Sequence, residues 1–221
     1  MLFRSYSYSG DFGFITNSKP ERDSTSFYGQ GTWNHSDSLR TVFGLRHTKD
    51  EVYSAVTNFY GRSGTDILET DGNKVTGRFV VEKDIDDNTM VYGSFTRGYK
   101  PGGSNLTYGR EDEVAQIVVL PTFQEEIVDA FEVGLKTDLA DGRARLNAAA
   151  FLYNYEGLQY QATDPEVFEG GVGNIPDSEI YGAELELSTF LSDSVILDLR
   201  MSWLDTEITA DHLALDNVES E

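Results

Sequence analysis

The chain has 221 residues, of which 39% are hydrophobic and 12% aromatic, and its 38 acidic and 17 basic residues give a net charge of −21. This apolar content is too high for a disordered acidic tail. The negative charge and the absence of a Lys/Arg cluster argue against a nucleic-acid partner. Because cysteine is absent, disulfides, thiol nucleophiles and cysteine-ligated metals are excluded, which fits several cellular compartments.

No segment has the features of a helical anchor or a secretion signal. Apolar runs fall short of the roughly 18 residues that a spanning helix needs. The first residues alternate apolar and polar side chains instead of placing an apolar core after a basic stretch. The sequence therefore predicts neither a transmembrane helix nor a signal peptide.

The dominant periodicity of the chain is two, which is typical of strands with one apolar face. In the segment 131–136, Phe131 and Val133 fall on one side, and Glu132 and Lys136 fall on the other. The same alternation predicts strands in the segments 27–33, 39–48, 75–81, 90–97, 144–152, 181–188 and 195–203. We expect about eight strands of about 10 to 14 residues, with a possible ninth at the N-terminus.

The predicted connections alternate between short and long. Short polar turns are expected at 34–38, 84–88, 138–142 and 191–194, and long loops near 49–74, 99–125 and 162–177. Long strands with short turns at one end and long loops at the other are typical of an outer-membrane β-barrel. Aromatic residues toward strand ends, namely Trp33, Tyr92, Tyr153, Tyr155, Phe190 and Trp203, fit an interfacial girdle or a soluble core equally well. Periodicity alone does not tell whether the polar face lines a wet lumen or forms a soluble exterior.

Three segments favour the barrel. The run MVYGSFTRGYKPGGSN (90–105) contains a Gly-Tyr-Lys-x-Gly-Gly signature, FEVGLK opens the hairpin 131–159, and IYGAELEL (180–187) contains a Gly-x-Glu strand. In this order they resemble TonB-dependent outer-membrane receptors. The resemblance implies an all-β fold: an antiparallel transmembrane barrel section, part of a barrel of 22 strands. Residues 1–221 would form this partial barrel domain, without the plug domain, signal peptide and terminal strands that the family carries.

The resemblance also implies a function for the complete protein. Such receptors sit in the outer membrane and take up a scarce solute, such as a ferric siderophore, haem, cobalamin or a glycan, with energy passed on by TonB. The expected partners are therefore the plug domain, TonB, the solute, and outer-membrane lipid and lipopolysaccharide. No enzymatic activity and no cofactor is expected. The net charge of −21 motivates the further hypothesis that acidic loops bind divalent cations that bridge to lipopolysaccharide.

The candidate site residues are of two kinds. Gly98, Gly102 and Gly103 around Pro101 fit a plain exit from a strand into a loop, and the alternative is that Tyr99 and Lys100 contact a ligand at the barrel mouth. Charged residues inside the strands are expected to face the lumen or the plug: Arg46, Arg97, Glu132, Lys136, Glu184, Glu186 and Arg200.

Other readings of the sequence remain open. The carboxylate pair Glu184 and Glu186 fits a lumen wall better than the acid/base pair of a secreted glycosidase. His35, His47 and His212 have no metal-ligand spacing, and no phosphate loop, nucleophile elbow or dinucleotide fingerprint is present. A soluble β-propeller shares the repeat of about 50 residues, although its blades pack four short strands into that length. A small self-contained barrel of the outer membrane is the other alternative.

Overall fold

The computed structural model describes residues 17–57, 65–105, 120–163 and 170–210. The predicted N-terminal strand and His212 lie outside the described residues, as do the last residues of the chain. Within the described part, no helix is long and apolar enough to cross a membrane.

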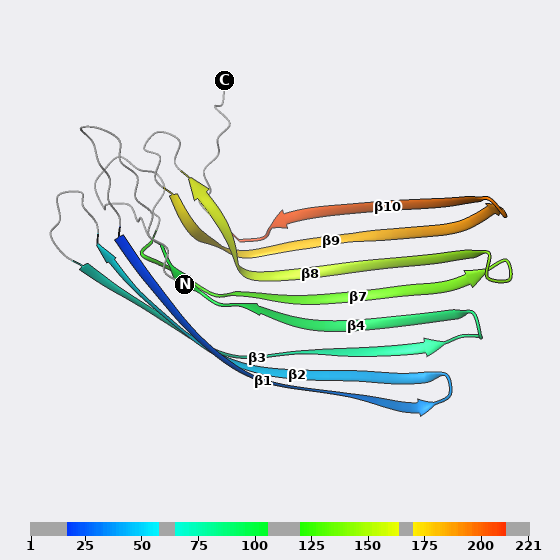
Figure 1. Cartoon of the computed structure of the whole chain (residues 1–221), viewed down its shortest axis with the longest axis horizontal. Coiled ribbons are helices and arrows are strands. Elements are labelled where there is room, and N and C mark those ends of the chain that lie inside the picture. The colour runs from blue at the N-terminus through cyan, green and yellow to red at the C-terminus, as the bar shows by residue number, and fades with distance from the viewer. Residues whose placement is uncertain (1–16, 58–64, 106–119, 164–169, 211–221) are drawn as a thin grey trace, which may run out of the picture.

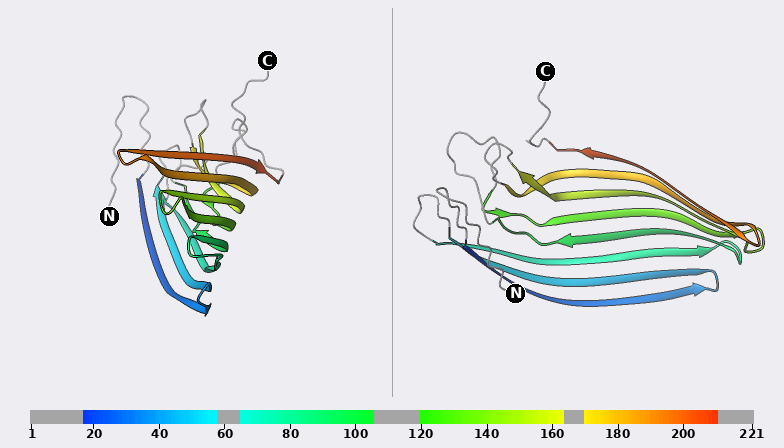
Figure 2. Two further views of the ribbon diagram at one scale, coloured as in Figure 1. Left: turned by 90° about the vertical axis from the view of Figure 1, so that its right-hand side faces the viewer. Right: turned by 45° about the horizontal axis from the view of Figure 1, so that its top comes forward.

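The described chain is all-β, as predicted, and it contains ten strands. These are β1 (Asn17–Ser36), β2 (Leu39–Thr57), β3 (Thr65–Asp84), β4 (Thr89–Lys100), β5 (Gly103–Ser104), β6 (Thr122–Phe123), β7 (Glu126–Leu139), β8 (Ala144–Thr163), β9 (Gly170–Ser192) and β10 (Val195–Ile208). Eight of them form one antiparallel sheet in the order β1-β2-β3-β4-β7-β8-β9-β10, and β5 pairs with β6 alone. The eight strands lie side by side in one curved layer (Figures 1 and 2).

All four short turns lie where the sequence predicts them, and they gather at one end of the sheet (Figure 1). At the β7–β8 turn, Ala140, Asp141 and Gly142 have positive φ angles of 53°, 55° and 80°. Asp and Gly tolerate this backbone conformation better than most residues, which explains why the turn is so short.

The strands are longer than predicted, and the long loops are correspondingly shorter. The strands β1, β3 and β8 each have 20 residues and β9 has 23, against an expectation of about 10 to 14. Most of the segment 49–74, which was expected to be a loop, belongs to β2 and β3. Its polar residues break the alternation of apolar side chains, so periodicity did not identify this part of either strand.

The two faces of the sheet have opposite chemistry and opposite exposure. On one face, here called the apolar face, large side chains are exposed, among them Leu45 (63%), Val133 (62%) and Met201 (62%). On the other, the polar face, Asp50 is 3% and Ser54 0% exposed. Soluble proteins seldom expose a continuous apolar surface while burying polar groups. This inversion is the arrangement expected of a membrane barrel wall.

The apolar face carries a band that runs obliquely across the strands. A row of directly paired residues, one on each strand, leads from Leu45 on β2 across the sheet to Glu207 on β10. The row therefore begins at an apolar residue and ends at a charged one. On β10, the apolar residues that share this face end at Trp203, nearer the short turn, and Asp205 and Glu207 follow them. A level band on tilted strands produces such an offset, and strands of transmembrane barrels are tilted by roughly 35–45°.

Neither the β-propeller nor the small self-contained barrel fits this arrangement. A propeller would divide the chain into four-stranded blades, whereas the described strands form one continuous meander. Among the described residues, β1 and β10 are the two unpaired edges, so the sheet is an open wall and not a closed small barrel.

Candidate functional site: the polar face and its mouth

The polar face brings together six of the seven charged residues predicted to face the lumen. Pairing between adjacent strands places Glu132 opposite Ser94 and Phe151, and it places Glu186 opposite Asn147 and Arg200. By the same register, Arg46, Glu132, Lys136, Glu184, Glu186 and Arg200 share one face.

The prediction that Arg97 lies on the same face is wrong. Arg97 pairs with Gly77 and Asp129, in the row of Leu45, on the apolar face. There its guanidinium binds the Asp129 carboxylate through two hydrogen bonds of 2.6 and 2.5 Å. The charge is tolerated because this pair lies where the apolar band ends and Asn154 and Glu179 continue the row.

Tyr92, Glu132 and Lys136 form a compact cluster on the polar face, toward the short turns. The Tyr92 hydroxyl donates a hydrogen bond of 2.6 Å to Oε1 of Glu132, and Lys136 Nζ lies 5.6 Å from the centre of the Tyr92 ring. The Tyr92 ring lies directly over Gly134, and a Cβ added at Gly134 would collide with the ring. The glycine of the FEVGLK motif therefore makes room for Tyr92.

The three tyrosines among the aromatic residues at strand ends belong to this polar face and not to the apolar face. Tyr92, Tyr153 and Tyr155 share the face of Glu132 through the pairs Tyr92–Gly134, Ala130–Tyr153 and Val128–Tyr155. Tyr153 stacks on Phe151 with ring centres 4.8 Å apart. An interfacial girdle, one of the two roles left open for these aromatic residues, therefore does not include the three tyrosines, whereas Trp33 and Trp203 are 65% and 59% exposed on the apolar face.

The arginines of the polar face differ in their partners. Arg46 donates hydrogen bonds to hydroxyl groups, to Ser26 at 2.8 Å and to Thr48 at 3.1 Å. Arg200 lies 3.5 Å from a Glu186 carboxylate oxygen, and both side chains are more than half exposed. Such exposed groups contribute little to stability, so they remain available to a partner on this face.

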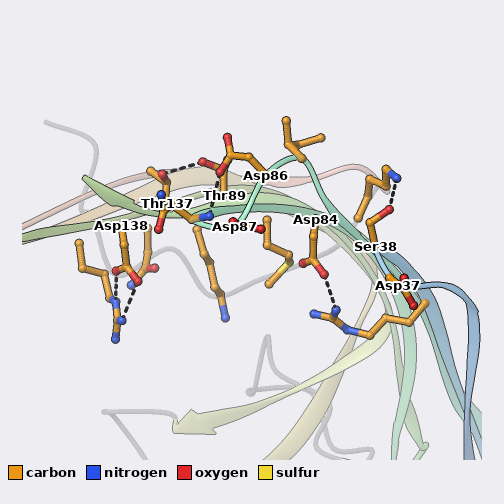
Figure 3. Close-up of a pocket in the computed structure, with 16 residues that line it drawn as sticks. Asp37, Ser38, Asp84, Asp86, Asp87, Thr89, Thr137 and Asp138 are labelled. Carbon is orange, nitrogen blue, oxygen red and sulfur yellow. Dashed lines mark hydrogen bonds and ion pairs between the residues drawn. The ribbon is translucent and has the colours of Figure 1, made fainter. Parts of the chain in front are cut away.

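The short turns surround a hollow of about 960 Å³ on the polar face, which Figure 3 shows in close-up. Arg40 of β2 binds Glu82 at 2.5 Å and Asp84 at 2.9 Å, and Arg145 binds Asp138 at 2.7 and 3.1 Å. Lys136, one of the predicted residues, also lines this hollow. Because each of these cations already has a carboxylate partner or an aromatic ring, they hold neighbouring strands together.

Tyr99 and Lys100 lie at the opposite end, the mouth, where their environments differ. The Tyr99 side chain reaches across to β3, and an added Cβ at Gly72 would collide with its hydroxyl. Lys100 is 58% exposed, lies 4.0 Å from a Glu126 carboxylate oxygen, and lines a cavity of about 350 Å³. Tyr99 is therefore packed into the wall, and Lys100 is the member of the pair that faces open space.

The cavity at the mouth combines cations, hydroxyl groups and an aromatic ring. Its lining residues are Pro20, Glu21, Arg22, Val52, Ser54, Lys100, Pro101, Gly102, Gly103, Ser104, Phe123 and Gln159. Arg22 is half-exposed and lies 3.3 Å from the buried carboxylate of Asp50. Such a set is able to contact an oxygen-rich anionic group through Arg22 and Lys100 and an apolar group through Phe123.

Three amide side chains that the sequence analysis did not single out organise this mouth: Asn105, Gln159 and Asn174. Each binds backbone groups of segments distant in sequence, for example Asn105 with Val172. A single Asn or Gln in a polar stretch gives no signal of such contacts, so periodicity and motifs did not find them. Among the described residues, no group of three or more His, Asp or Glu is placed to hold a metal ion.

Comparison with known families decides the classification. The family model described as "TonB dependent receptor-like, beta-barrel" matches residues 3–219. The chain belongs to this family. It is also similar to the probable TonB-dependent siderophore receptor PiuA of Acinetobacter baumannii, with 27% identity over 168 residues, which is 75% of this chain and 21% of the relative. Receptors of this family are outer-membrane proteins.

Solved receptors share the fold. The ferric yersiniabactin uptake receptor FyuA of Yersinia pestis matches with a TM-score of 0.72 and 20% identity, over 89% of this chain and 28% of that one. The siderophore receptor PiuA of A. baumannii matches with a TM-score of 0.69 and 22% identity, over 90% and 28%. The chain thus spans between a fifth and a third of the length of these relatives.

Proposed function

We propose that this chain is part of the barrel wall of an outer-membrane receptor that takes up a ferric siderophore with energy supplied through TonB. The observation that carries the proposal is the inverted sheet, with exposed apolar side chains on one face and a polar, partly buried face on the other. PiuA and FyuA are named as receptors for a siderophore and for ferric yersiniabactin. Similarity to them favours a ferric siderophore as the solute over haem, cobalamin or a glycan.

In this proposal the apolar face meets lipid and the polar face meets water and the plug domain. Arg46, Glu132, Glu184, Glu186 and Arg200 then line the lumen. The exposed, weakly paired charges of Glu186 and Arg200 are suited to contacts with polar groups of the plug. The chain acts in binding and transport, and no catalytic role is assigned to it.

The mouth cavity is the proposed point of contact with the solute. Lys100 supplies an exposed ammonium group, Arg22 a second cation and Phe123 an aromatic ring. Ferric siderophores often carry negative charge on oxygen donors, and such groups are attracted by paired cations. Tyr99 supports this region from within the wall, since its hydroxyl packs against β3.

The test is uptake of radioactive iron by siderophore-deficient cells that express the complete receptor gene containing this chain. We expect uptake of at least one ferric siderophore from a panel of catecholates, phenolates and hydroxamates, and its loss when the proton gradient is dissipated. Energised uptake of haem, cobalamin or a glycan alone, or no energised uptake of any of them, contradicts the proposal.

A matched pair of lysine variants then tests the cavity. Lys100→Gln is expected to weaken solute binding about 3- to 10-fold, the loss of one charge-assisted contact. Lys83→Gln, near the short turns, is expected to leave binding unchanged, because Lys83 binds Ser38 and lines the hollow at the other end of the wall. Equal effects of the two substitutions contradict a solute contact at Lys100.

A further inference from the structure

The described parts of the connection between β4 and β7 form a narrow strap across the polar face. Its two described arms, 101–105 and 120–125, pair through β5 and β6, with Gly103 opposite Phe123 and Ser104 opposite Thr122. The backbone N–H of Asn105 also donates to Pro121 at 2.9 Å. Gly102 and Gly103 permit the close approach of the arms, because an added Cβ would lie 2.5 Å from the Phe123 carbonyl oxygen or 2.6 Å from its ring.

One side of the strap is fixed to β2 and β3. The Ser104 hydroxyl donates a hydrogen bond of 2.6 Å to the hydroxyl of Ser54, whose side chain is completely buried. Lys74 of β3 forms an ion pair with Glu125. These contacts skip β4, the strand from which the strap leaves, so the strap lies across the sheet and does not simply extend it.

The other side of the strap is fixed to β8 and β9 by side-chain amides. Asn105 accepts the backbone N–H of Val172 at 2.8 Å and donates to the Val172 carbonyl at 2.9 Å, and it is only 4% exposed. The Asn174 side chain likewise accepts the backbone N–H of Gln124 at 2.8 Å and donates to the Gln124 carbonyl at 3.0 Å. Gln159 donates to Pro101 and Gln124, each at 2.9 Å.

A kink in β8 and β9 brings these amides to the strap. Gly157 has a positive φ of 67°, and an added Cβ would lie 2.5 Å from the Glu125 carbonyl oxygen. The register passes from Glu156–Asp177 to Leu158–Ile175, which leaves Gly157 and Pro176 outside the regular pairing. Beyond this point the ends of the two strands bend away from the line of the sheet (Figure 1).

We propose that this strap is a fixed brace: it stays seated between β2–β3 and β8–β9 throughout solute binding and transport, and it keeps the mouth cavity preformed. The inference deepens the proposed uptake function, on which its transport arm rests. The Asn105 side chain binds both the N–H and the carbonyl group of one residue, Val172, so both hydrogen bonds break together if the strap lifts. Each broken hydrogen bond of a buried group raises the free energy of the lifted state. The cavity lies beside the brace, since Ser104, Phe123 and Gln159 line it.

The absence of cysteine from the chain permits a direct test. The complete receptor with Ser54→Cys and Ser104→Cys is oxidised in whole cells, and the rate and yield of disulfide formation are measured without solute and during energised uptake. The hydroxyl oxygens of these serines lie 2.6 Å apart, which suits the short S–S bond. Each single variant is the control, together with the pair Ser94→Cys and Ser104→Cys, which is expected to stay uncross-linked because Ser94 lies in the middle of β4.

We expect almost complete cross-linking without solute, and a cross-linking rate during energised uptake within about two-fold of that without solute, since a brace that does not move keeps the two cysteines together in both states. Asn174→Ala is expected to slow cross-linking about threefold or more, because three hydrogen bonds to its amide are lost. Asn34→Ala, on an exposed part of β1, is expected to leave the rate unchanged.

Two results overturn the inference: failure to cross-link although both cysteines react with a thiol reagent, and a cross-linking rate that falls several-fold during energised uptake. The second result would make the strap a moving gate. Because the cross-linking yield without solute does not depend on uptake, a receptor that transports no ferric siderophore contradicts the proposed function while the yield still reports whether the brace is seated.

Discussion

The Tyr92 hydroxyl donates a 2.6 Å hydrogen bond to Glu132 across the pair of β4 and β7, and the tyrosine ring lies over Gly134 to reach it. This relationship joins two of the sequence motifs, one ending in GYKPGG and the other beginning FEVGLK. It explains in physical terms why a glycine lies between Glu132 and Lys136 in a strand, where glycine is otherwise unfavourable.

Gly134→Ala is accordingly expected to destabilise the folded receptor by about 1–3 kcal/mol, because the new methyl group displaces the Tyr92 ring. The measurement is the free energy of unfolding in detergent. Gly93→Ala is the control, since its added Cβ would meet only ordinary contacts at 3.9 and 4.0 Å. Equal stability of the two variants contradicts the role of Gly134.

The amide brace predicts a second stability difference. Asn105→Ala is expected to cost about 2–4 kcal/mol, because it removes three part-buried hydrogen bonds and leaves the Val172 N–H and two carbonyl groups without this partner. Asn73→Ala, which removes one exposed hydrogen bond to His47, is expected to cost less than about 1 kcal/mol. Thermal unfolding of both variants in the same detergent measures the difference, and similar midpoints would count against the brace.

Because Arg97 lies on the apolar face, we expect its substitution to have little effect on transport. Arg97→Gln removes an ion pair with Asp129 in which the arginine is half exposed, so a loss below about 1 kcal/mol is expected. Solute uptake is expected to stay unchanged, because the side chain does not face the interior. A large fall in uptake at unchanged receptor abundance would show that Arg97 acts inside the barrel after all.

Neighbouring residues on β10 provide a test of lipid contact. Met201→Arg places a charge in the middle of the apolar band and is expected to destabilise the receptor in lipid by about 2–4 kcal/mol. Ser202→Arg, one position along and on the other face, is expected to change stability by less than about 1 kcal/mol. Refolding into lipid vesicles at graded urea concentrations measures both variants, and equal losses contradict the assignment of faces.

Alternation of side chains and turn composition were enough to predict most of this wall. The strands, the four short turns and six of the seven charged residues follow from period two, because each strand has one apolar side. Arg97 was misassigned by its charge, although it shares the parity of Phe95, on the apolar side. Parity was the better guide, since a charge at the edge of the band is stabilised by Asp129.

The mouth was beyond the reach of sequence patterns. Asn105 and Val172 are 67 residues apart in sequence, and their contact depends on the kink at Gly157 and on the strap that crosses the sheet. The polar parts of β2 and β3 within the segment 49–74 lack alternating apolar side chains, so they were predicted to be a loop. Both features depend on long-range backbone pairing, which local composition does not encode.

The most direct test of the account is the accessibility of single spin labels on the two faces of the complete receptor in lipid. Cysteines introduced at Val133 and at Ser94 lie on adjacent strands at similar height, and the native chain segment adds no competing thiol. The account predicts that the label at Val133 collides with oxygen dissolved in the bilayer, and that the label at Ser94 collides with a water-soluble nickel reagent. The opposite pattern, or equal access of the nickel reagent to both sites, would contradict a barrel wall with its polar face inward.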